Sequence, residues 1–583
     1  MTPPASESPR YEADEQSPLL PTLGYGLQFS LIAAATLLVT PVIVANAAER
    51  GEPYVTWMVF ASLVVVGIST IIQVRRLGGV GAGAVLPMFT AAFSIPFCIT
   101  ALVDGGPATL TTLLLVAAGV QLVASRWLFL LRRFVTPTVG GTVMMILSIT
   151  LASVVFDLLD TATRAEPDAA AVTALVTLGV AAALMLRRSA VLRFWGPLAG
   201  IVAGCIVAGG LGIYDTARIA EAAWIGLPAE APGLALDFSI DFWTLVPAFL
   251  FLGVIIAIQA NGAAIAMQRV AWRDDRAVDF RQVQGAVAGA GASNVFAGLA
   301  GTVPNAINPA VIPFTQITGI AARRLGYAIG LLLLGVAFLP KVSAVLSSIP
   351  GPVMTGYLIM VTGALFVDGA RTVIQHEQHQ EKIVVAGVCF WIAAAFQFDL
   401  FALPDVGAVG GALLESGITT GGLAAIVMIL YLEFTNPRRL RFQAPLDVAA
   451  LPELNAFLAR FAQRRGWDTA MQERLGAVAE ETLLTLAPLD LSPDGAEEQP
   501  QTARQLVVLA SSEGTAADLE FIGGGTGVNL EDQIRQIQQH DTLTVVEQEL
   551  SLVLLRSYAA SVTHQQYHDT DIITVRVLPP DPR

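Results

Sequence analysis

Two amide side chains, Gln259 and Asn261, stand in a stretch that is otherwise largely apolar from residue 243 to residue 267. An amide group can donate and accept hydrogen bonds at once, which suits a planar solute whose edge alternates N–H and C=O groups. Polar side chains within apolar spans usually face the interior of a helix bundle. The two amides therefore predict a solute contact, with a hydrogen bond between helices as the alternative.

A second polar stretch, residues 304–313, holds three prolines and two asparagines between apolar flanks. Prolines at this density cannot form an unbroken helix, and a broken helix in a membrane is tolerated where it lines an enclosed cavity. If the chain is helical again from Ala310, the first N–H groups of that half-helix face the cavity whatever the side chains are. Asn308, just before it, is either a solute contact or an N-cap.

The elements that must position these residues are membrane-spanning helices. Hydrophobic residues make up 54% of the 583 residues and charged residues only 14%, which excludes soluble and disordered classes. The net charge of −14 argues against a nucleic-acid partner. Cys98, Cys205 and Cys389 lie far apart inside apolar runs. We expect them to be buried, and we expect no disulfide, metal or cofactor.

Apolar runs of about twenty residues are long enough to cross a bilayer. The sequence has fourteen, at residues 25–46, 54–74, 81–103, 108–130, 137–158, 169–186, 190–212, 242–267, 282–301, 304–320, 325–346, 350–367, 382–399 and 418–434. Glycine and proline interrupt the third and the tenth, and such corresponding breaks predict a 7+7 inverted repeat with its site at the bilayer midplane. Phe93, after the first break, is a candidate for stacking on a planar ring, with a place in the core as the alternative.

Arginine and lysine gather in the loops after even-numbered runs, whereas the loops after odd-numbered runs carry mainly acidic residues. By the positive-inside rule, we expect both termini in the cytoplasm. One of the basic loops also holds His376, Glu377, His379 and Glu381. Metal ligands occur at such spacing, but without a thiol or an apolar enclosure the cluster predicts a solvated surface.

Short motifs around the second break resemble the nucleobase/ascorbate transporter family, the uracil and xanthine permeases. Residues 297–304 read Ala-Gly-Leu-Ala-Gly-Thr-Val-Pro, similar to the family turn A-G-L-F-G-T-x-P, and residues 318–324 read Thr-Gly-Ile-Ala-Ala-Arg-Arg, similar to T-[GR]-V-x-S-R. Weaker similarities extend the resemblance over residues 24–434. It implies an all-α polytopic membrane domain with a core module of spans 1–4 and 8–11 and a gate module of spans 5–7 and 12–14.

The residues that read the substrate in that family are replaced in this chain. The eighth-span acid of the family falls on Gln259 and its Glu-Asn pair on Ala310 and Val311, and no titratable Asp, Glu, Lys, Arg or His stands in the middle of spans one, three, eight or ten. Such side chains cannot relay a proton, so proton coupling by the family mechanism is not expected. The expected substrate-binding set is Gln28, Phe93, Gln259, Asn261, Ala263, Asn308, Pro309, Ala310 and Val311.

After residue 436 the composition changes to that of a soluble domain. Its periodicity predicts helices at 451–464, 468–486 and 547–562 and strands at 505–511 and 570–577. This part resembles the ATPase domain of histidine kinases and anti-sigma factors, except that Thr485 replaces the asparagine that holds magnesium and Gly523 replaces the aspartate that reads adenine. We therefore expect a degenerate, regulatory α+β cytoplasmic domain.

These features predict three parts: a disordered cytoplasmic tail at 1–23, a membrane transporter at 24–436 and the regulatory domain at 437–583. We expect a transporter and not an enzyme, a homodimer in the cell membrane that moves a nucleobase-like solute by alternating access, with the coupling ion left open. One alternative is an anion carrier of the sulfate-permease type, although the cavity offers no cation to assist it. The other is a sensor that binds a solute and reports through the C-terminal domain.

Overall fold

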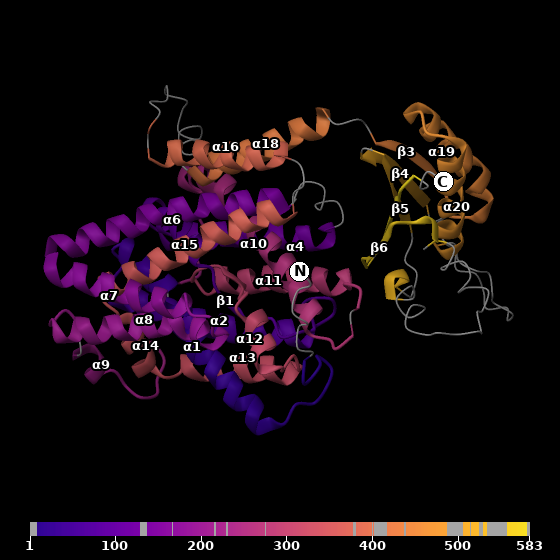
Figure 1. The fold of residues 1–583 in the computed structure, drawn as a ribbon. Coiled ribbons are helices and arrows are strands. Elements are labelled where there is room, and N and C mark those ends of the chain that lie inside the picture. Colours follow the sequence, from indigo (N-terminus) through magenta and orange to yellow (C-terminus); the bar gives the residue numbers. More distant parts are fainter. Residues whose placement is uncertain are drawn as a thin grey trace. The chain divides into compact units, whose positions relative to one another are not determined.

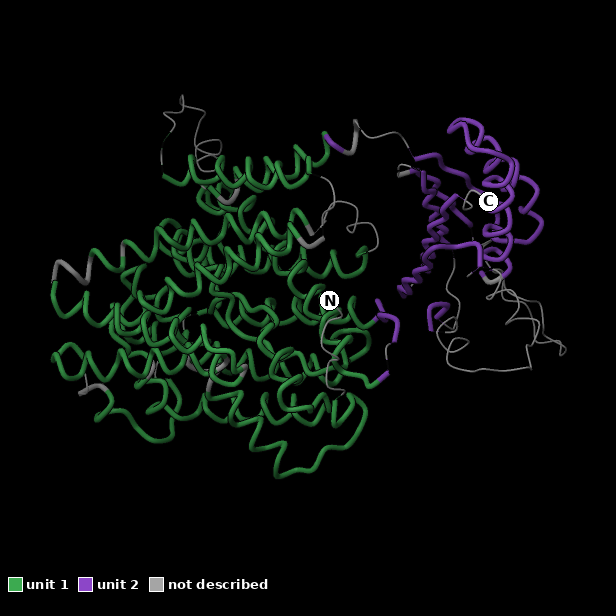
Figure 2. Tube along the Cα trace, viewed as in Figure 1, with its two compact units in different colours: residues 1–273, 282–431 green, residues 274–281, 432–583 purple. Residues whose placement is uncertain are grey.

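The computed structural model describes residues 9–579 apart from 129–136, 166, 215–216, 229–230, 232, 275, 377–379, 399, 401–416, 436–438, 487–504, 514, 524–528, 533–554, 556 and 569. The chain forms two compact units (Figure 2). The first consists of residues 1–273 and 282–431, and the second of residues 274–281 and 432–583. The second unit therefore includes residues 274–281, a short loop whose flanking residues on both sides belong to the first unit.

The first unit is helical because long apolar segments pair all their backbone groups internally only as helices. Its helices are α1 (Leu19–Ala47), α2 (Glu52–Arg75), α3 (Ile95–Asp104), α4 (Gly106–Arg126), α6 (Pro137–Ala165), α7 (Pro167–Met185), α8 (Ala190–Gly210), α9 (Ala217–Glu221), α10 (Ile240–Val270), α11 (Phe280–Leu299), α12 (Val311–Thr318), α13 (Arg323–Ala337), α14 (Pro340–Ser347), α15 (Gly351–His376), α16 (Gln380–Gln397) and α18 (Gly417–Thr435). Each of the fourteen apolar runs contains at least one of them. By length and composition, α2, α4, α6, α7, α10 and α15 can cross a membrane, which makes this unit a polytopic membrane domain.

The third and the tenth apolar runs are both broken, as predicted, and both breaks are short strands. Strand β1 (Met88–Thr90) precedes a short 3-10 helix, η1 (Ala92–Ser94), and α3, while β2 (Asn305–Ile307) precedes α12. The two strands pair in antiparallel orientation within the first unit, with Phe89 opposite Ala306. Figure 1 labels β1 among the helices of this unit. Two segments far apart in the sequence therefore meet through their backbones.

The backbone groups around this crossing are paired by side chains, as they must be away from water. Thr70 on α2 accepts a hydrogen bond from the Met88 N–H at 3.0 Å. One turn further along α2, the Gln73 amide accepts from the Ala82 N–H at 3.1 Å and donates to the Ala286 C=O at 2.9 Å. Helix α2 thus supplies the hydrogen bonds that β1 and the segment before it would otherwise lack.

The helices of the first unit pack in two groups. Helices α6, α7, α8, α15 and α16 contact one another, and α1, α2, α3, α4, α10 and α13 form the other group. Glycine allows the closest approach in each group: a Cβ on Gly141 of α6 would lie 2.6 Å from the Gly369 oxygen of α15, and one on Gly67 of α2 would lie 2.9 Å from the Gly330 oxygen of α13. Larger residues at these glycines would force the helices apart.

The chain before α1 is ordered from residue 9 onwards, although we expected a disordered tail over residues 1–23. Residues 9–17 lie against the loops after α10 and α12, and α1 already begins at Leu19. Residues 1–8 lie outside the described residues.

The second unit is an antiparallel sheet covered by two helices. The strand order is β3-β4-β5-β7-β6, with bounds β3 (Leu440–Pro445), β4 (Gln505–Glu513), β5 (Ala516–Gly523), β6 (Ser561–Gln566) and β7 (Asp571–Val577). Helices α19 (Leu451–Arg465) and α20 (Thr469–Leu486) share one apolar core with the sheet. Alternate residues of β5 and β7 are buried, the pattern of strands with one face on a core.

The predicted helices at 451–464 and 468–486 and the predicted strands at 505–511 and 570–577 are confirmed by α19, α20, β4 and β7. The predicted helix at 547–562 is wrong at its end, because Ser561 and Val562 begin β6 and pair with β7. Residues 547–554 lie outside the described residues. Pairing with β7 overrides the helical period that the sequence shows there.

Candidate functional site

The elements that carry the expected site residues meet around the β1–β2 crossing. Helix α10 contacts α3, β2 and α12, and α1 contacts β1 and α3. The ring centroids of Phe97 on α3 and Phe249 on α10 are 6.0 Å apart, and those of Phe29 on α1 and Phe314 on α12 are 5.2 Å apart. Edge-on aromatic contacts of this kind hold both half-helices against full-length neighbours.

Gln259 reaches from α10 to the outer edge of β2. Its Nε2 donates a long hydrogen bond to the Ile307 C=O at 3.5 Å. Its Oε1 is buried and has no hydrogen-bond partner among the described residues. The amide is therefore held at the crossing while its acceptor stays available for the N–H group of a solute.

Asn294 on α11 pairs with the same edge of β2 two residues earlier, at Asn305. Its Oδ1 accepts from the Asn305 N–H at 2.6 Å, and its Nδ2 donates to the Asn305 C=O at 2.9 Å. The same Nδ2 also donates to Gln121 Oε1 on α4 at 2.9 Å. A side-chain amide thus takes the place of a third strand beside β2.

Asn305 itself brings an unused amide into the crossing. The residue is fully buried, and neither its Oδ1 nor its Nδ2 has a partner among the described residues. The Gln121 Nε2 is also buried and has no hydrogen-bond partner among the described residues. A buried polar group without a partner costs about 1–3 kcal/mol, so these atoms indicate a place where a polar ligand or water completes the hydrogen bonds.

Asn305, Gln121 and Asn294 were not among the site residues expected from the sequence. Asn305 counted only as part of the break in the tenth run. Gln121 and Asn294 carry the signal that identified Gln259, an amide within a largely apolar helix. Applied to every span, that signal would have found Gln121 and Asn294 but not Asn305, which lies in β2.

The expectation of free N–H groups at the start of the second half-helix is wrong. The Ala310 N–H donates to Asn308 Oδ1 at 3.0 Å. The Val311 N–H donates to the Asn308 C=O at 3.3 Å, and the Ile312 N–H donates to the Pro309 C=O at 3.1 Å. A tight turn uses these donors before α12 begins at Val311. The Asn308 side chain thus bonds within the turn, and the N–H groups of Ala310, Val311 and Ile312 are already paired.

The remaining expected residues differ in how they are placed. Phe93 in η1 is buried, and Gln28 on α1 is partly exposed. On α10, Ala263 is buried and shares the face of Gln259 because it lies four residues further on. Asn261 lies two residues from Gln259 and therefore points to a different face. The structure brings Ala263 and Gln259 together and separates Asn261 from them.

A cavity lies apart from the crossing, beside α2, α9 and α14. It is lined by Glu52, Thr56, Glu221, Ser343 and Ser347 among others. None of the expected site residues lines this cavity, so the unpaired amides at the crossing remain the feature that indicates a solute site.

Among the described residues, no three His, Cys, Asp or Glu side chains are grouped to hold a metal ion. Two of the four residues of the His376 cluster, Glu377 and His379, lie outside that part of the chain.

Comparison with known proteins gives a consistent assignment. The model of the Permease family (Xan_ur_permease) matches residues 21–399. A putative purine permease of Clostridium perfringens, CPE0397, is 26% identical over 443 residues, which are 75% of this chain and 96% of the relative. The xanthine permease XanP of Escherichia coli K12 is 26% identical over 446 residues, 72% of this chain and 94% of the relative.

Among solved structures, the transmembrane domain of the cyanobacterial bicarbonate transporter BicA matches with a TM-score of 0.45 and 17% identity over 72% of this chain and all of that one. The family model covers well over half of the chain and includes α1 to α16, with the β1–β2 crossing at its centre. The chain therefore belongs to the Permease family, whose members are membrane transporters and not enzymes.

Proposed function

We propose that the chain is a secondary transporter that moves a planar, nucleobase-like solute across the membrane by alternating access. The names of its relatives, purine and xanthine permeases, support the solute class. Within the chain, one observation carries the proposal: the amides of Gln259 and Asn305 bring buried, unpaired polar atoms to the crossing of the two broken spans. A nucleobase edge would complete their hydrogen bonds.

The full solute site is part of the proposal. Gln259 and Asn305 read the edge of the ring, Ala263 leaves space on the same helix face, and Phe93 stacks on the ring. Gln28 lies on the neighbouring helix α1 and contributes a polar contact at the rim. We assign Asn308 to the turn because its side chain is already bonded to the Ala310 N–H. Pro309, Ala310 and Val311 bound the site, and Asn261 is its least supported member.

We also propose fourteen spans in a 7+7 inverted repeat, with both termini in the cytoplasm. A helix in every apolar run supports the count. Two strand-then-helix segments that pair in antiparallel orientation support the inverted relation of the halves. The two packing groups of helices support a core of spans 1–4 and 8–11 and a gate that includes spans 5–7, 12 and 13. A homodimer is the assembly that we propose for this fold.

For the second unit we propose a regulatory role. It contains residues 274–281, the loop between α10 and α11. Within the unit, the Ala277 N–H donates to the Asp532 carboxylate at 2.7 Å, and the Phe280 and Tyr567 rings lie 5.1 Å apart. Because this loop directly follows the helix of Gln259, it can carry a conformational signal from the solute site. A sensing role is therefore the second candidate function.

Uptake into proteoliposomes tests the transport proposal. The purified full chain should accumulate radiolabelled xanthine, uracil or hypoxanthine above protein-free vesicles. A proton gradient should not accelerate uptake, because no acid stands at the crossing. Solute binding without uptake would favour the sensor, and uptake of bicarbonate or sulfate in place of nucleobases would favour the anion carrier. The proposal is refuted if the chain neither takes up nor binds any nucleobase.

A further inference from the structure

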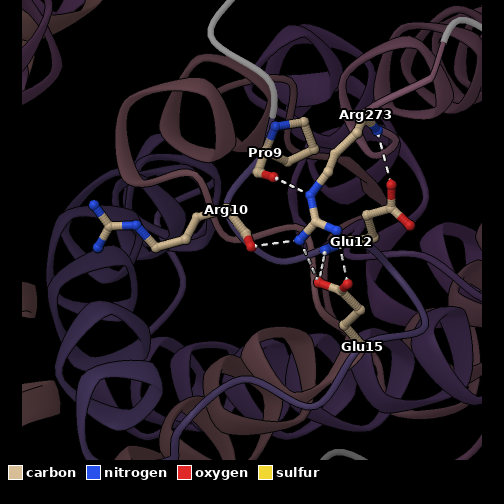
Figure 3. A network of polar contacts seen from close by, with 5 residues as sticks. All are labelled: Pro9, Arg10, Glu12, Glu15 and Arg273. Carbon is tan, nitrogen blue, oxygen red and sulfur yellow. Dashed lines mark hydrogen bonds and ion pairs between the residues drawn. The ribbon is translucent and has the colours of Figure 1, made fainter.

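Residues 9–17, which we call the N-terminal brace, hold Arg273 at the end of α10 (Figure 3). Both terminal nitrogens of Arg273 donate to the Glu15 carboxylate, at 2.9 and 2.8 Å. Its Nε donates to the Pro9 C=O at 3.2 Å, and Nη2 also donates to the Arg10 C=O at 2.7 Å. The planar guanidinium thus bonds two backbone carbonyls and one carboxylate in its own plane, a geometry that lysine cannot copy.

The same brace pairs with the chain that follows α12. The Tyr11 N–H donates to the Gly319 C=O and the Ala321 N–H donates to the Tyr11 C=O, both at 2.9 Å. The Arg323 N–H then donates to the Ala13 C=O at 3.1 Å. Two of these bonds form a parallel β-bridge between Tyr11 and Ile320, and the third extends the pairing to Ala13 beside the α12–α13 connection.

Gly319 is shaped for this contact. Its φ is +70°, and a Cβ at this position would lie 3.2 Å from the Arg10 backbone. A side chain would be strained by the backbone angle and crowded by the brace. Beside it, Ala13 packs with Ala271 and Ala321 in a small buried apolar cluster. The polar contacts of the brace thus surround a dry centre.

Arg323 extends the contact to the first broken span. Its Nη2 forms an ion pair with Asp14 of the brace at 2.8 Å. Its Nε donates to the Gly83 C=O at 2.5 Å, and Gly83 lies in the segment that leads into β1. One side chain therefore links the brace, the start of α13 and the entry to the β1–β2 crossing.

We propose that the N-terminal brace positions the solute site by fixing the end of α10 relative to α12 and to the segment before β1. These are the three segments that bring Gln259, the half-helix and the crossing together, and the brace is bonded to the first two directly and to the third through Arg323. Arg273 is the central positioning residue, although it lies outside the site. The inference rests on the proposed solute site, which it deepens.

The ion pairs alone would be a weak basis for this role. The side chains of Arg273 and Glu15 remain 43% and 38% exposed, and exposed ion pairs contribute little to stability. The backbone pairing, the bidentate geometry and the buried alanines act together, so the brace works as a unit. Its loss should therefore alter the geometry of the site more than the amount of folded protein.

Uptake kinetics of the full chain in proteoliposomes test the proposal with four variants. Arg273→Ala should raise the KM for the transported nucleobase at least about threefold, the scale of coupling between residues in one network, with Vmax per folded transporter unchanged. Glu15→Arg and Arg273→Glu should each do the same. The double variant that combines them restores an ion pair of reversed polarity but not the bonds to the Pro9 and Arg10 carbonyls, so its KM should return only part of the way to the unmodified value. If the brace only stabilised the fold, the substitutions would lower the total Vmax by lowering the amount of folded protein. KM would then stay unchanged in the single variants, and the double variant would have no change in KM to recover.

The matched control is Arg269→Ala. Arg269 lies one turn earlier on α10, is exposed, and has no hydrogen bond or ion pair with the described residues. Arg269→Ala removes the same charge four residues earlier in the chain, within the last turn of α10, without touching the brace, so KM should stay as in the unmodified chain. A KM change as large as that of Arg273→Ala would attribute the effect to charge and overturn the proposal.

Hydrogen exchange provides a measurement that does not depend on the solute. The amides of Ala321 and Arg323 donate to the brace, so peptides covering residues 319–324 should exchange faster in Arg273→Ala than in Arg269→Ala. Unchanged exchange together with unchanged KM would overturn the brace while leaving the proposed function intact. If the unmodified chain transports no nucleobase, the proposed function fails, and the exchange comparison still decides whether the brace holds these segments.

Discussion

Asn294 and Asn305 bring the same side chain to the same buried crossing, yet their amides are used in opposite ways. The Asn294 amide forms three hydrogen bonds, two of them with the Asn305 backbone. The Asn305 amide forms none with the described residues. The first therefore stabilises the fold, and the second is available to a ligand. Comparing the two separates stability from solute binding at one place in the molecule.

We expect Asn294→Leu to lower the free energy of unfolding by more than about 2 kcal/mol, because it leaves buried backbone groups of β2 unpaired. Asn305→Leu has nearly the same volume change and should leave the solute-free protein within about 1 kcal/mol, since it removes two atoms that were unpaired. Solute-induced stabilisation should nevertheless disappear in Asn305→Leu. Thermal unfolding in detergent, with and without nucleobase, measures both effects. Equal destabilisation by the two substitutions would contradict the assignment.

Gln259→Ala should weaken solute binding about tenfold or more, because losing one partner of a buried hydrogen bond costs about 1–3 kcal/mol. In the unmodified chain, affinity should be nearly constant between about pH 5 and 8, since amides do not titrate there. Gln259→Glu should introduce a pH dependence in which affinity rises as the carboxyl group loses its proton and becomes a stronger acceptor. Equilibrium binding to purified protein decides the matter. A steep pH dependence without substitution would show that the site is misplaced.

At the scale of elements, the sequence was sufficient to predict those features that depend on neighbouring residues in the chain. Apolar runs predicted the helices, and glycine and proline predicted the two breaks. The pairing of β1 with β2 was not predictable from either break, because eight α-helices of the described residues separate the two strands in the sequence. The contacts of the brace could not be predicted for a related reason. Residues 9–17 are short and polar, and their partners Arg273 and Gly319 lie far away in the sequence. The turn at Asn308 was open between two roles, and only its geometry decided between them.

The brace should respond to acid in a defined direction. Hydrogen bonds from Arg273, and then from the Glu12 N–H, lower the pKa of Glu15 from its usual value of 4.5. A lowered pKa means that the contribution of the charged Glu15 is fully present above 4.5 and is lost as the pH falls through the lowered value. The other acids of the brace are Asp14, which forms an ion pair with Arg323, and Glu12, whose carboxylate accepts from the Arg273 backbone N–H at 2.9 Å.

Protection of residues 319–324, corrected for intrinsic exchange, should therefore be constant from pH 8 to pH 5 and fall only below the usual glutamate pKa. Glu15→Gln should show the weaker protection at every pH and lose most of the acid response. Hydrogen exchange across this range provides the measurement. A transition near neutral pH would mean that another group controls the brace.

At the scale of the whole molecule, the two units pose separate questions. The first unit is a membrane domain, and the orientation that we propose for it is supported by the arginines between its helices. The second is an antiparallel sheet with two helices, in which Gly523 ends β5 opposite Asp571 of β7. The sequence separated the two near residue 436, close to the observed boundary, because their compositions differ. It could not show that residues 274–281 belong with the second unit, since that membership depends on tertiary contacts.

Cysteine labelling tests the proposed orientation. In a background without native cysteines, Asp160→Cys, exposed near the C-terminal end of α6, should react with a membrane-impermeant reagent from the outside. Arg188→Cys, exposed between α7 and α8, should react only after the membrane is opened. Those two positions fall on opposite sides if the positive-inside rule holds for this chain. The reverse pattern would invert the orientation and place both termini outside.

ATP binding tests the resemblance of the second unit to a nucleotide-binding domain. Because Thr485 and Gly523 stand where that domain has its magnesium and adenine contacts, the full chain should bind ATP weakly or not at all. Titration calorimetry in detergent, with and without magnesium, measures this directly. Micromolar binding that requires magnesium would show that other residues supply the missing contacts and that the domain is not degenerate.

The antiparallel ladder between β1 and β2 has a consequence for biosynthesis. The ribosome makes β1 long before β2, so during that interval the inward edge of β1 has no strand beside it. Open strand edges are not tolerated in hydrocarbon, and the nascent chain must therefore be shielded by the insertion machinery until Asn305 to Ile307 emerge. A chain truncated just before β2 should be recovered bound to that machinery or be degraded, whereas one truncated after α12 should persist in the membrane.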